Sequence, residues 1–217
     1  MSERRWVILD VGETLIDETR VWSIWADMLD IPQLTFMAGF GATLARGGEY
    51  RDVFDLFGRS DWRSRWPEHE DIYGGFREED LYPDAIRSVD ALRGKGYSVA
   101  IIGNQPASRS AQLRAIGLTA DVIAMSEEMG VAKPAPAFFD RMRELVGSPS
   151  PELIAYVGDR VDNDVLPALA AGMRAVWIRR GPWGFIGQPP EVQPALVVGS
   201  LDELAERIDG AWEETSG

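Results

Sequence analysis

The sequence predicts an α/β protein with a Rossmann-like parallel sheet, helices on both faces of the sheet, and a small all-helical unit inserted near its start. Short apolar runs recur along the chain, amphipathic segments of helical period separate them, and several runs end in Gly or Asp. Alternating strands and helices favour a parallel sheet, because each parallel crossover needs a connection of helix length.

The elements follow in a regular order. A first strand is expected at residues 6–10, and residues 18–80 hold three amphipathic segments separated by polar, glycine-rich breaks, with no strand-like alternation. A helix then ends near Gly94 and Gly96. Further strands are expected at 97–102, 121–125, 153–157, 174–178 and 195–198, and the Pro- and Gly-rich residues 181–194 are expected to form a loop.

Composition limits the classes of function. With 217 residues, of which 45% are hydrophobic and 26% charged, the chain can bury a full core as one domain with an insertion. Its net charge of −13 argues against nucleic acid and anionic membranes as partners. No apolar run approaches a membrane span and no leader pattern is visible, so a cytoplasmic location is expected.

Two residue types are scarce. The chain has no cysteine, which excludes disulfides, thiol nucleophiles and thiolate metal sites. Its single histidine, His69, lies in the polar stretch WPEHED and is expected in a solvated loop rather than in a catalytic site. Zinc sites rich in histidine are therefore excluded as well.

The strongest functional signal is the segment WVILDVGETLID, residues 6–17. An apolar strand ends there in Asp10, followed by Gly12 and Thr14 in a tight loop. In an open parallel sheet, ligands bind at the carboxyl ends of the strands. Asp10 is thus placed for chemistry, although the same Asp could instead cap the helix that follows.

Three later segments add groups suited to metal-assisted phosphoryl transfer. A second strand runs into Gly103 and Asn104, and Lys133 stands before a helix that Pro134 and Pro136 indicate. A third apolar strand then opens into an acidic loop that carries Asp159, Asp162 and Asp164. A carboxylate nucleophile, an ammonium group and a carboxylate cluster form a coherent set of catalytic groups.

These four segments, in this order, resemble the signature motifs of the haloacid dehalogenase superfamily, in the branch of phosphoglycolate phosphatases and haloacid dehalogenases. The resemblance runs from Trp6 to the last expected helix. It implies that Asp10 forms an aspartyl intermediate, that Lys133 neutralises Asp10 and the incoming anion, and that Asp159 and Asp164 help to hold Mg²⁺. It also implies a core domain of residues 1–17 and 81–217 with a helical cap of residues 18–80. Most aromatic residues of that segment are expected to form the core of the cap: Trp22, Trp25, Phe36, Phe40, Tyr50, Phe54 and Phe57.

Two positions depart from the family pattern. Gly12 replaces the Asp that protonates the leaving oxygen and later activates water, and we expect this loss to cost about 10²- to 10⁴-fold in rate for poor leaving groups. The neighbouring Glu13 is a weak candidate to replace it. Gly103 stands where the family has a Ser or Thr hydroxyl, so that backbone N–H groups of Gly103 and Asn104 would have to contact the anion.

The metal site is expected to survive these changes. The resemblance assigns a backbone carbonyl contact to the second motif position, and Gly12 still has that group. Asp10, the Gly12 carbonyl and Asp159 would bind Mg²⁺ directly, and Asp164 would act through water or by orienting Lys133. Asp162 is expected to cap a helix. In the cap, Arg46 stands beside two glycines and is our first choice for an arginine that binds the substrate. The alternative is that Arg46 is a solvated charge at the end of a helix.

Three functions remain open at this point. The first is a Mg²⁺-dependent phosphatase for a small phosphate ester or acyl phosphate, favoured because it uses all retained motifs. The second is a dehalogenase in which Asp10 displaces halide, which leaves without an acid. The third is a binding or regulatory protein with attenuated catalysis. The sequence does not distinguish a monomer from a homodimer, and it does not name the substrate.

Overall fold

The computed structural model describes residues 4–213 of the chain. In this range an all-parallel, six-stranded sheet has the order β3-β2-β1-β4-β5-β6. Its strands are β1 (Trp6–Leu9), β2 (Ser98–Gly103), β3 (Val122–Met125), β4 (Ile154–Gly158), β5 (Arg174–Ile178) and β6 (Leu196–Val198). Each strand lies within one residue of its expected bounds, and the predicted parallel α/β fold is confirmed.

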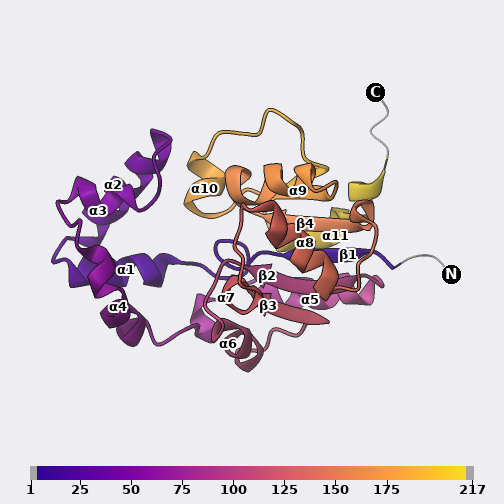
Figure 1. Cartoon of the computed structure of the whole chain (residues 1–217), viewed down its shortest axis with the longest axis horizontal. Coiled ribbons are helices and arrows are strands. Elements are labelled where there is room, and N and C mark those ends of the chain that lie inside the picture. Colours follow the sequence, from indigo (N-terminus) through magenta and orange to yellow (C-terminus); the bar gives the residue numbers. More distant parts are fainter. Residues whose placement is uncertain (1–3, 214–217) are drawn as a thin grey trace.

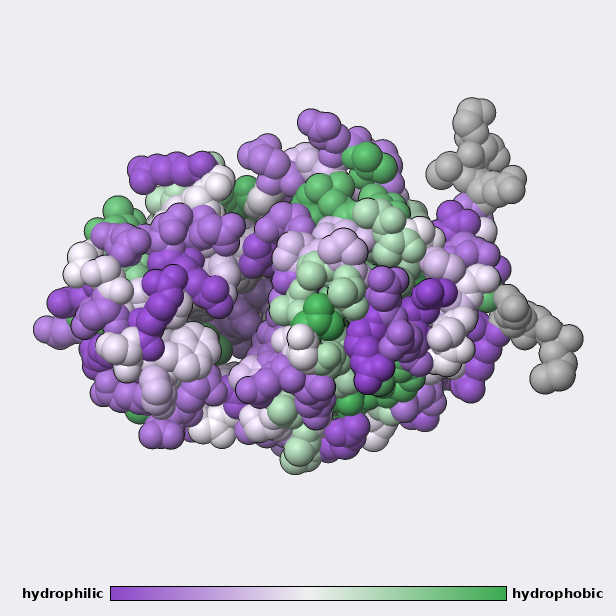
Figure 2. Space-filling view, viewed as in Figure 1, coloured by the Kyte–Doolittle hydropathy of each residue, from purple (hydrophilic) through white to green (hydrophobic). Residues whose placement is uncertain are grey.

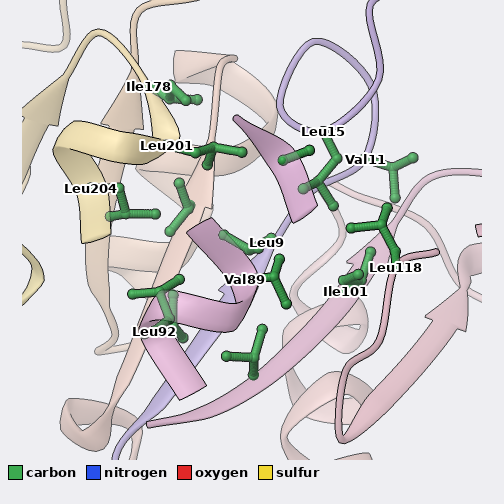
Figure 3. Close-up of a cluster of buried hydrophobic side chains, with 14 of the residues drawn as sticks. Leu9, Val11, Leu15, Val89, Leu92, Ile101, Leu118, Ile178, Leu201 and Leu204 are labelled. Atoms are coloured by element: carbon green, nitrogen blue, oxygen red, sulfur yellow. The ribbon is translucent and has the colours of Figure 1, made fainter. Parts of the chain in front are cut away.

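The sheet is covered on both faces because its strands are apolar on both sides. In β1, Val7 and Leu9 belong to one buried cluster, and Ile8, which points to the opposite face, belongs to another. The helices α5 (Ala85–Gly94), α6 (Arg109–Ala115) and α11 (Leu201–Arg207) supply the first cluster, part of which Figure 3 shows. The second cluster is supplied by α8 (Pro136–Leu145) and α9 (Leu166–Ala170).

Shorter elements complete the sheet unit. They are α7 (Ser126–Met129), α10 (Gly181–Ile186), the π-helical turn η4 (Val161–Val165) and the 3₁₀ turns η3 (Pro151–Leu153) and η5 (Ile208–Trp212). A further 3₁₀ turn, η2 (Glu78–Asp80), stands at the end of residues 18–80. The π-helical turn lies in the acidic loop after β4, and Asp162 there pairs with Arg160 (2.6 Å) rather than capping a helix. Extra turns of this kind are common at functional sites.

Residues 18–80 form a separate group of helices, which we call the helical insert (Figure 1). It contains α1 (Thr19–Met28), α2 (Gln33–Ala45), α3 (Asp52–Leu56), the 3₁₀ turn η1 (Trp62–Arg65) and α4 (Trp66–Tyr73). Its own apolar cluster is built from aromatic side chains, among them Trp22, Trp25, Phe36, Phe40 and Phe54. These residues were expected to form the core of the insert, and their burial confirms it.

The chain enters and leaves the insert side by side. Asp17 N–H donates to the Asp80 carbonyl (2.8 Å), and an antiparallel bridge joins Ile16 to Leu81. Arg20 then ties the first turn of α1 to the segment by which the chain leaves the insert, through an ion pair with Asp80 (2.5 Å). The insert is therefore attached to the sheet unit through two adjacent connections.

Two expectations about this part of the molecule were wrong. His69 is fully buried in α4, where its ring stacks on Trp25 at a centroid distance of 4.5 Å and hydrogen-bonds the Val21 carbonyl. Residues 181–194 are not only loop, since they include α10, whose Trp183 packs on Phe40 and Tyr50 of the insert. Among the described residues, no helix is long and apolar enough to cross a membrane.

We predict that Phe138→Ala, which empties part of the cluster beneath α8, lowers the free energy of unfolding by about 3 to 5 kcal/mol. The matched control is Phe185→Ala in α10, because that side chain is 72% exposed and its loss should change stability by less than about 0.5 kcal/mol. Urea unfolding of both variants checks this. Equal losses in the two variants would contradict the assignment of the core.

Candidate active site

Three neighbouring strands bring the predicted residues to one edge of the sheet. Asp10 follows β1, Gly103 ends β2 and Asp159 follows β4, and β1 pairs with both of the other strands. Because these strands are parallel, their carboxyl ends meet at the same edge, where open α/β sheets bind ligands. Motifs that are far apart in sequence therefore converge.

The ammonium group of Lys133 lies between two carboxylates at this edge. Its Nζ is 2.7 Å from Asp10 Oδ1 and 2.6 Å from Asp164 Oδ1, and its side chain is almost completely buried. Burial by itself lowers the pKa of Lys133, but the charges of Asp10 and Asp164 outweigh it and hold that pKa well above its ordinary value. Lys133 is therefore a fixed positive charge beside Asp10.

Three carboxylates come together at this edge, those of Asp10, Asp159 and Asp164. One oxygen atom from each lies within 4.8 Å of the others. Within residues 4–213, the buried Oδ2 of Asp159 has no hydrogen-bond partner. Burial, followed by the charges of Asp164 and Asp10, raises the pKa of Asp159 well above its ordinary value. A divalent cation fits this arrangement, since it would supply both the missing partner and the missing positive charge.

Asp164 has a different environment from Asp159. Its Oδ1 accepts from Lys133 Nζ, and its Oδ2 accepts from the Arg160 backbone N–H (2.9 Å). Burial raises the pKa of Asp164 to about 6 against the lowering effect of Lys133. Both oxygens already have donors, so this geometry suits the expected role of Asp164 in orienting Lys133.

Two glycines let the carboxylates lie against the backbone. A Cβ on Gly103 would stand 2.4 Å from Asp10 Oδ1, and a Cβ on Gly158 would stand 2.4 Å from the Asp164 carboxyl carbon. Neither contact is tolerable, so any side chain at these positions would displace a carboxylate. The hydroxyl that is absent at position 103 thus has its space taken by the nucleophile candidate itself.

Asn104 holds the lysine segment in place. Its Nδ2 donates to the Lys133 carbonyl (3.0 Å), and the Lys133 backbone N–H donates to Asn104 Oδ1 (2.8 Å). This pair of bonds joins the end of β2 to the segment before α8. The side chain of Asn104 therefore positions Lys133, while the expected contact of the Gly103 and Asn104 N–H groups with an anion stays a prediction.

A cavity of about 700 Å³ opens at the site, and the surface is hollowed between the insert and the sheet unit (Figure 2). Asp10, Lys133 and Asp159 line it together with Gly12 and Asn104. The lining also contains many aromatic side chains, namely Trp22, Trp25, Tyr50, Trp66, Tyr73, Phe76 and Trp183. The cavity thus combines a charged set of groups with a large aromatic surface.

The structure does not bring Arg46 to this cavity. Arg46 is exposed at the end of α2, and the arginines in the lining are Arg51, Arg109 and Arg160. Arg109 is buried and paired with Glu70 (2.6 Å), and Arg160 lies over the Trp183 ring. Arg46 was expected at the site because glycines follow it in the sequence. In the structure Gly47, with a φ of 73°, forms the turn that ends α2.

Two carboxylates of the loop after β1 take different places. Glu13 is buried outside the cavity lining, where Tyr82 Oη donates to it (2.5 Å) and the Glu18 N–H also donates (3.1 Å). Glu18, which the sequence analysis did not single out, lines the cavity beside Asp10 and Gly12. Burial and the charges of Glu13 and Asp10 raise the pKa of Glu18 to about 8.

Comparison with known proteins agrees with this geometry. A family model of haloacid dehalogenase-like hydrolases matches residues 5–172. A phosphoserine phosphatase of Thermus thermophilus is 31% identical over 89% of this chain and 77% of its own length. A glyceraldehyde 3-phosphate phosphatase of Pyrococcus furiosus is 27% identical over 94% and 92%, respectively. The chain therefore belongs to the haloacid dehalogenase-like hydrolase family.

Solved structures show the same fold at lower identity. The HAD-hydrolase YfnB of Bacillus subtilis, bound to magnesium, superposes with a TM-score of 0.68 at 21% identity, covering 95% of this chain and 99% of that one. The L-2-haloacid dehalogenase of Xanthobacter autotrophicus superposes with a TM-score of 0.66 at 18% identity, covering 95% of this chain and 99% of that one. A HAD phosphatase of Thermococcus onnurineus also superposes, with a TM-score of 0.61 at 24% identity, covering 95% of this chain and 98% of that one. The fold alone therefore does not separate phosphatase from dehalogenase activity.

We predict that Glu13→Gln stabilises the protein at pH 8 by roughly 1 to 3 kcal/mol and much less at pH 5. Burial raises the pKa of Glu13 from 4.5 to about 7, so the folded state loses stability as the pH rises through that window. The amide of Gln never ionises and avoids this loss. Urea unfolding at the two pH values checks it, and a stability difference independent of pH would contradict it.

Proposed function

We propose that the protein is a Mg²⁺-dependent phosphatase that acts on a small phosphorylated metabolite through an aspartyl phosphate on Asp10. The observation that carries this proposal is the arrangement of Lys133 between Asp10 and Asp164, with the unpaired Asp159 oxygen beside them. A nucleophilic carboxylate, a fixed cation and a carboxylate pair suited to Mg²⁺ are the groups that phosphoryl transfer requires.

The residues of the chain have separate roles in this reaction. An oxygen of Asp10 attacks phosphorus, and Lys133 offsets the negative charge that Asp10 and the phosphoryl group bring together. Asp164 and Asn104 keep Lys133 in place through the bonds described above. Mg²⁺, held by Asp10, the Gly12 carbonyl and Asp159, would neutralise charge on the phosphoryl oxygens when bound.

We further propose that the helical insert is a cap that closes over the substrate. The aromatic lining of the cavity comes mainly from this insert, with Trp183 of α10 opposite it. Such a surface suits a leaving group with an apolar or aromatic portion, and closure would exclude water from the reacting atoms. The named activities of the relatives, on phosphoserine and glyceraldehyde 3-phosphate, support a small organic phosphate.

Dehalogenation is the second candidate, supported by the likeness to haloacid dehalogenase structures. Displacement of halide at carbon needs Asp10 but has no use for a divalent cation. The unpaired Asp159 oxygen and the repulsion among the three carboxylates favour the phosphatase instead. A panel of aryl, acyl and alkyl phosphates together with 2-haloacids separates these candidates, and no turnover of any of them would favour a binding protein.

We predict that Asp10→Asn lowers kcat/KM on phosphate substrates by at least about 10³-fold, because the nucleophile is lost. Rapid quenching of the unmutated protein followed by borohydride reduction and mass spectrometry should place the covalent intermediate at Asp10. Asp17→Asn serves as the control, since that carboxylate caps the Thr19 N–H outside the cavity lining. Turnover that survives in the Asp10 variant would refute the assignment of the nucleophile.

We also predict that Mg²⁺ at about 100 times its Kd raises the Tm by about 5 °C or more, because the cation binds the folded state alone. Asp159→Asn should abolish this rise. Asp162→Asn should keep it, since Asp162 is exposed and paired with Arg160. Differential scanning calorimetry with and without chelator measures the effect, and an undiminished rise in the Asp159 variant would place the cation elsewhere.

A further inference from the structure

We propose that Glu18 is the general acid and base of the reaction, in place of the carboxylate that position 12 lacks. The proposal rests on the phosphatase function above. It begins from the space beside Gly12: a Cβ built on Gly12 would lie 2.4 Å from Glu18 Oε1 and 2.9 Å from its carboxyl carbon. The Glu18 carboxyl therefore occupies the space into which a side chain at position 12 would grow.

The backbone conformation does not require glycine at position 12. Its φ lies outside the left-handed region that excludes ordinary side chains. A side chain at position 12 would instead meet the Glu18 carboxyl, which would have to move. The carboxyl group that is missing at position 12 is thus matched by that of Glu18, which comes from six residues further along the chain.

The local fold holds Glu18 in this position. Its N–H donates to Glu13 Oε1 (3.1 Å), and its carbonyl accepts from Trp22 N–H in the first turn of α1 (3.2 Å). The backbone of Glu18 is therefore fixed at the start of the insert. Within residues 4–213 no hydrogen bond holds its carboxyl group, which lines the cavity together with Asp10 and Gly12 and remains available to a substrate.

Three other carboxylates near the cavity have partners of their own. Glu13 is held by Tyr82 and is outside the lining. Glu70 pairs with Arg109 (2.6 Å), and Glu127 accepts from the Ala107 N–H (2.6 Å). Apart from the residues next to Gly12 in the chain, the three atoms nearest to a Cβ built there all belong to Glu18. Glu18 is the carboxylate whose position matches the missing group.

The proton transfers balance over the two steps. As Asp10 bonds to phosphorus and the bond from phosphorus to the leaving oxygen breaks, the Glu18 carboxyl gives its proton to that oxygen, and the alcohol departs. A water oxygen then bonds to phosphorus, the bond from phosphorus to Asp10 breaks, and the water proton passes to the Glu18 carboxylate. Inorganic phosphate leaves, and both residues return to their starting states.

The first test is Glu18→Gln, which keeps size and polarity but cannot transfer the proton. For an alkyl phosphate, kcat/KM should fall about 10²- to 10⁴-fold. The leaving group of 4-nitrophenyl phosphate needs little protonation, so with this substrate the rate of phosphoenzyme formation should fall less than about 10-fold. Hydrolysis of the intermediate should slow with both substrates, so the phosphoenzyme should accumulate in the variant. Asp17→Asn, which removes the carboxylate next to Glu18 in the chain but outside the cavity lining, should leave all three rates within about twofold.

The second test exchanges the two positions. Gly12→Asp alone should not raise activity, because its side chain meets the Glu18 carboxyl. Glu18→Ala should lose alkyl-phosphate turnover as Glu18→Gln does. In the double variant Gly12→Asp with Glu18→Ala, kcat/KM for the alkyl phosphate should be at least about tenfold higher than in Glu18→Ala alone. This recovery shows that the loss in Glu18→Ala is not a failure to fold.

The outcomes separate the two proposals. If the unmutated protein forms no intermediate on Asp10, the phosphatase proposal and the role of Glu18 fall together. If the intermediate forms but Glu18→Gln forms and hydrolyses it at unchanged rates, the role of Glu18 alone is overturned. Equal losses for alkyl and 4-nitrophenyl phosphate in the formation step would also overturn it, since they indicate a structural effect rather than protonation of the leaving oxygen.

Discussion

The site depends on one buried interaction, the contact of the Lys133 ammonium with the carboxylates of Asp10 and Asp164. These three charges lie at the carboxyl edge of a sheet whose strands are mainly apolar and buried, and an isolated charge there would be strongly disfavoured. Together they still carry a net negative charge, to which Asp159 adds. This excess of negative charge suits the divalent cation that we propose for the site.

Three glycines leave space for the carboxylates of the site. At Gly103 and Gly158 the absent side chain gives room to Asp10 and Asp164, and at Gly12 it gives room to Glu18. In sequence, the family resemblance implies that Gly12 and Gly103 stand where relatives have catalytic side chains. In space, each makes room for a carboxylate that comes from another part of the chain, so the changes alter how the site is assembled without emptying it.

Strand positions, the order of the sheet motifs and the aromatic core of the insert could be predicted, because burial on both faces of a parallel sheet leaves a periodic apolar signal. The convergence of Asp10, Gly103 and Asp159 followed from the topology rule for parallel strands. The approach of Lys133 and Asp164 to them was implied by the family resemblance. The roles of Arg46, His69 and Glu18 could not be read in this way. Each depends on how a side chain folds back across a loop or a helix, and the polar neighbours of His69 gave no sign that its ring stacks on Trp25.

The most direct test of this account is the position of the cation. A crystal of the protein soaked in Mn²⁺, with anomalous diffraction measured at the manganese edge, would locate it without reference to activity. The account predicts a single strong anomalous peak within coordination distance of Asp10 and Asp159, with Lys133 still in contact with Asp10. A peak at another group of carboxylates, with the oxygen of Asp159 left unpaired, would contradict it.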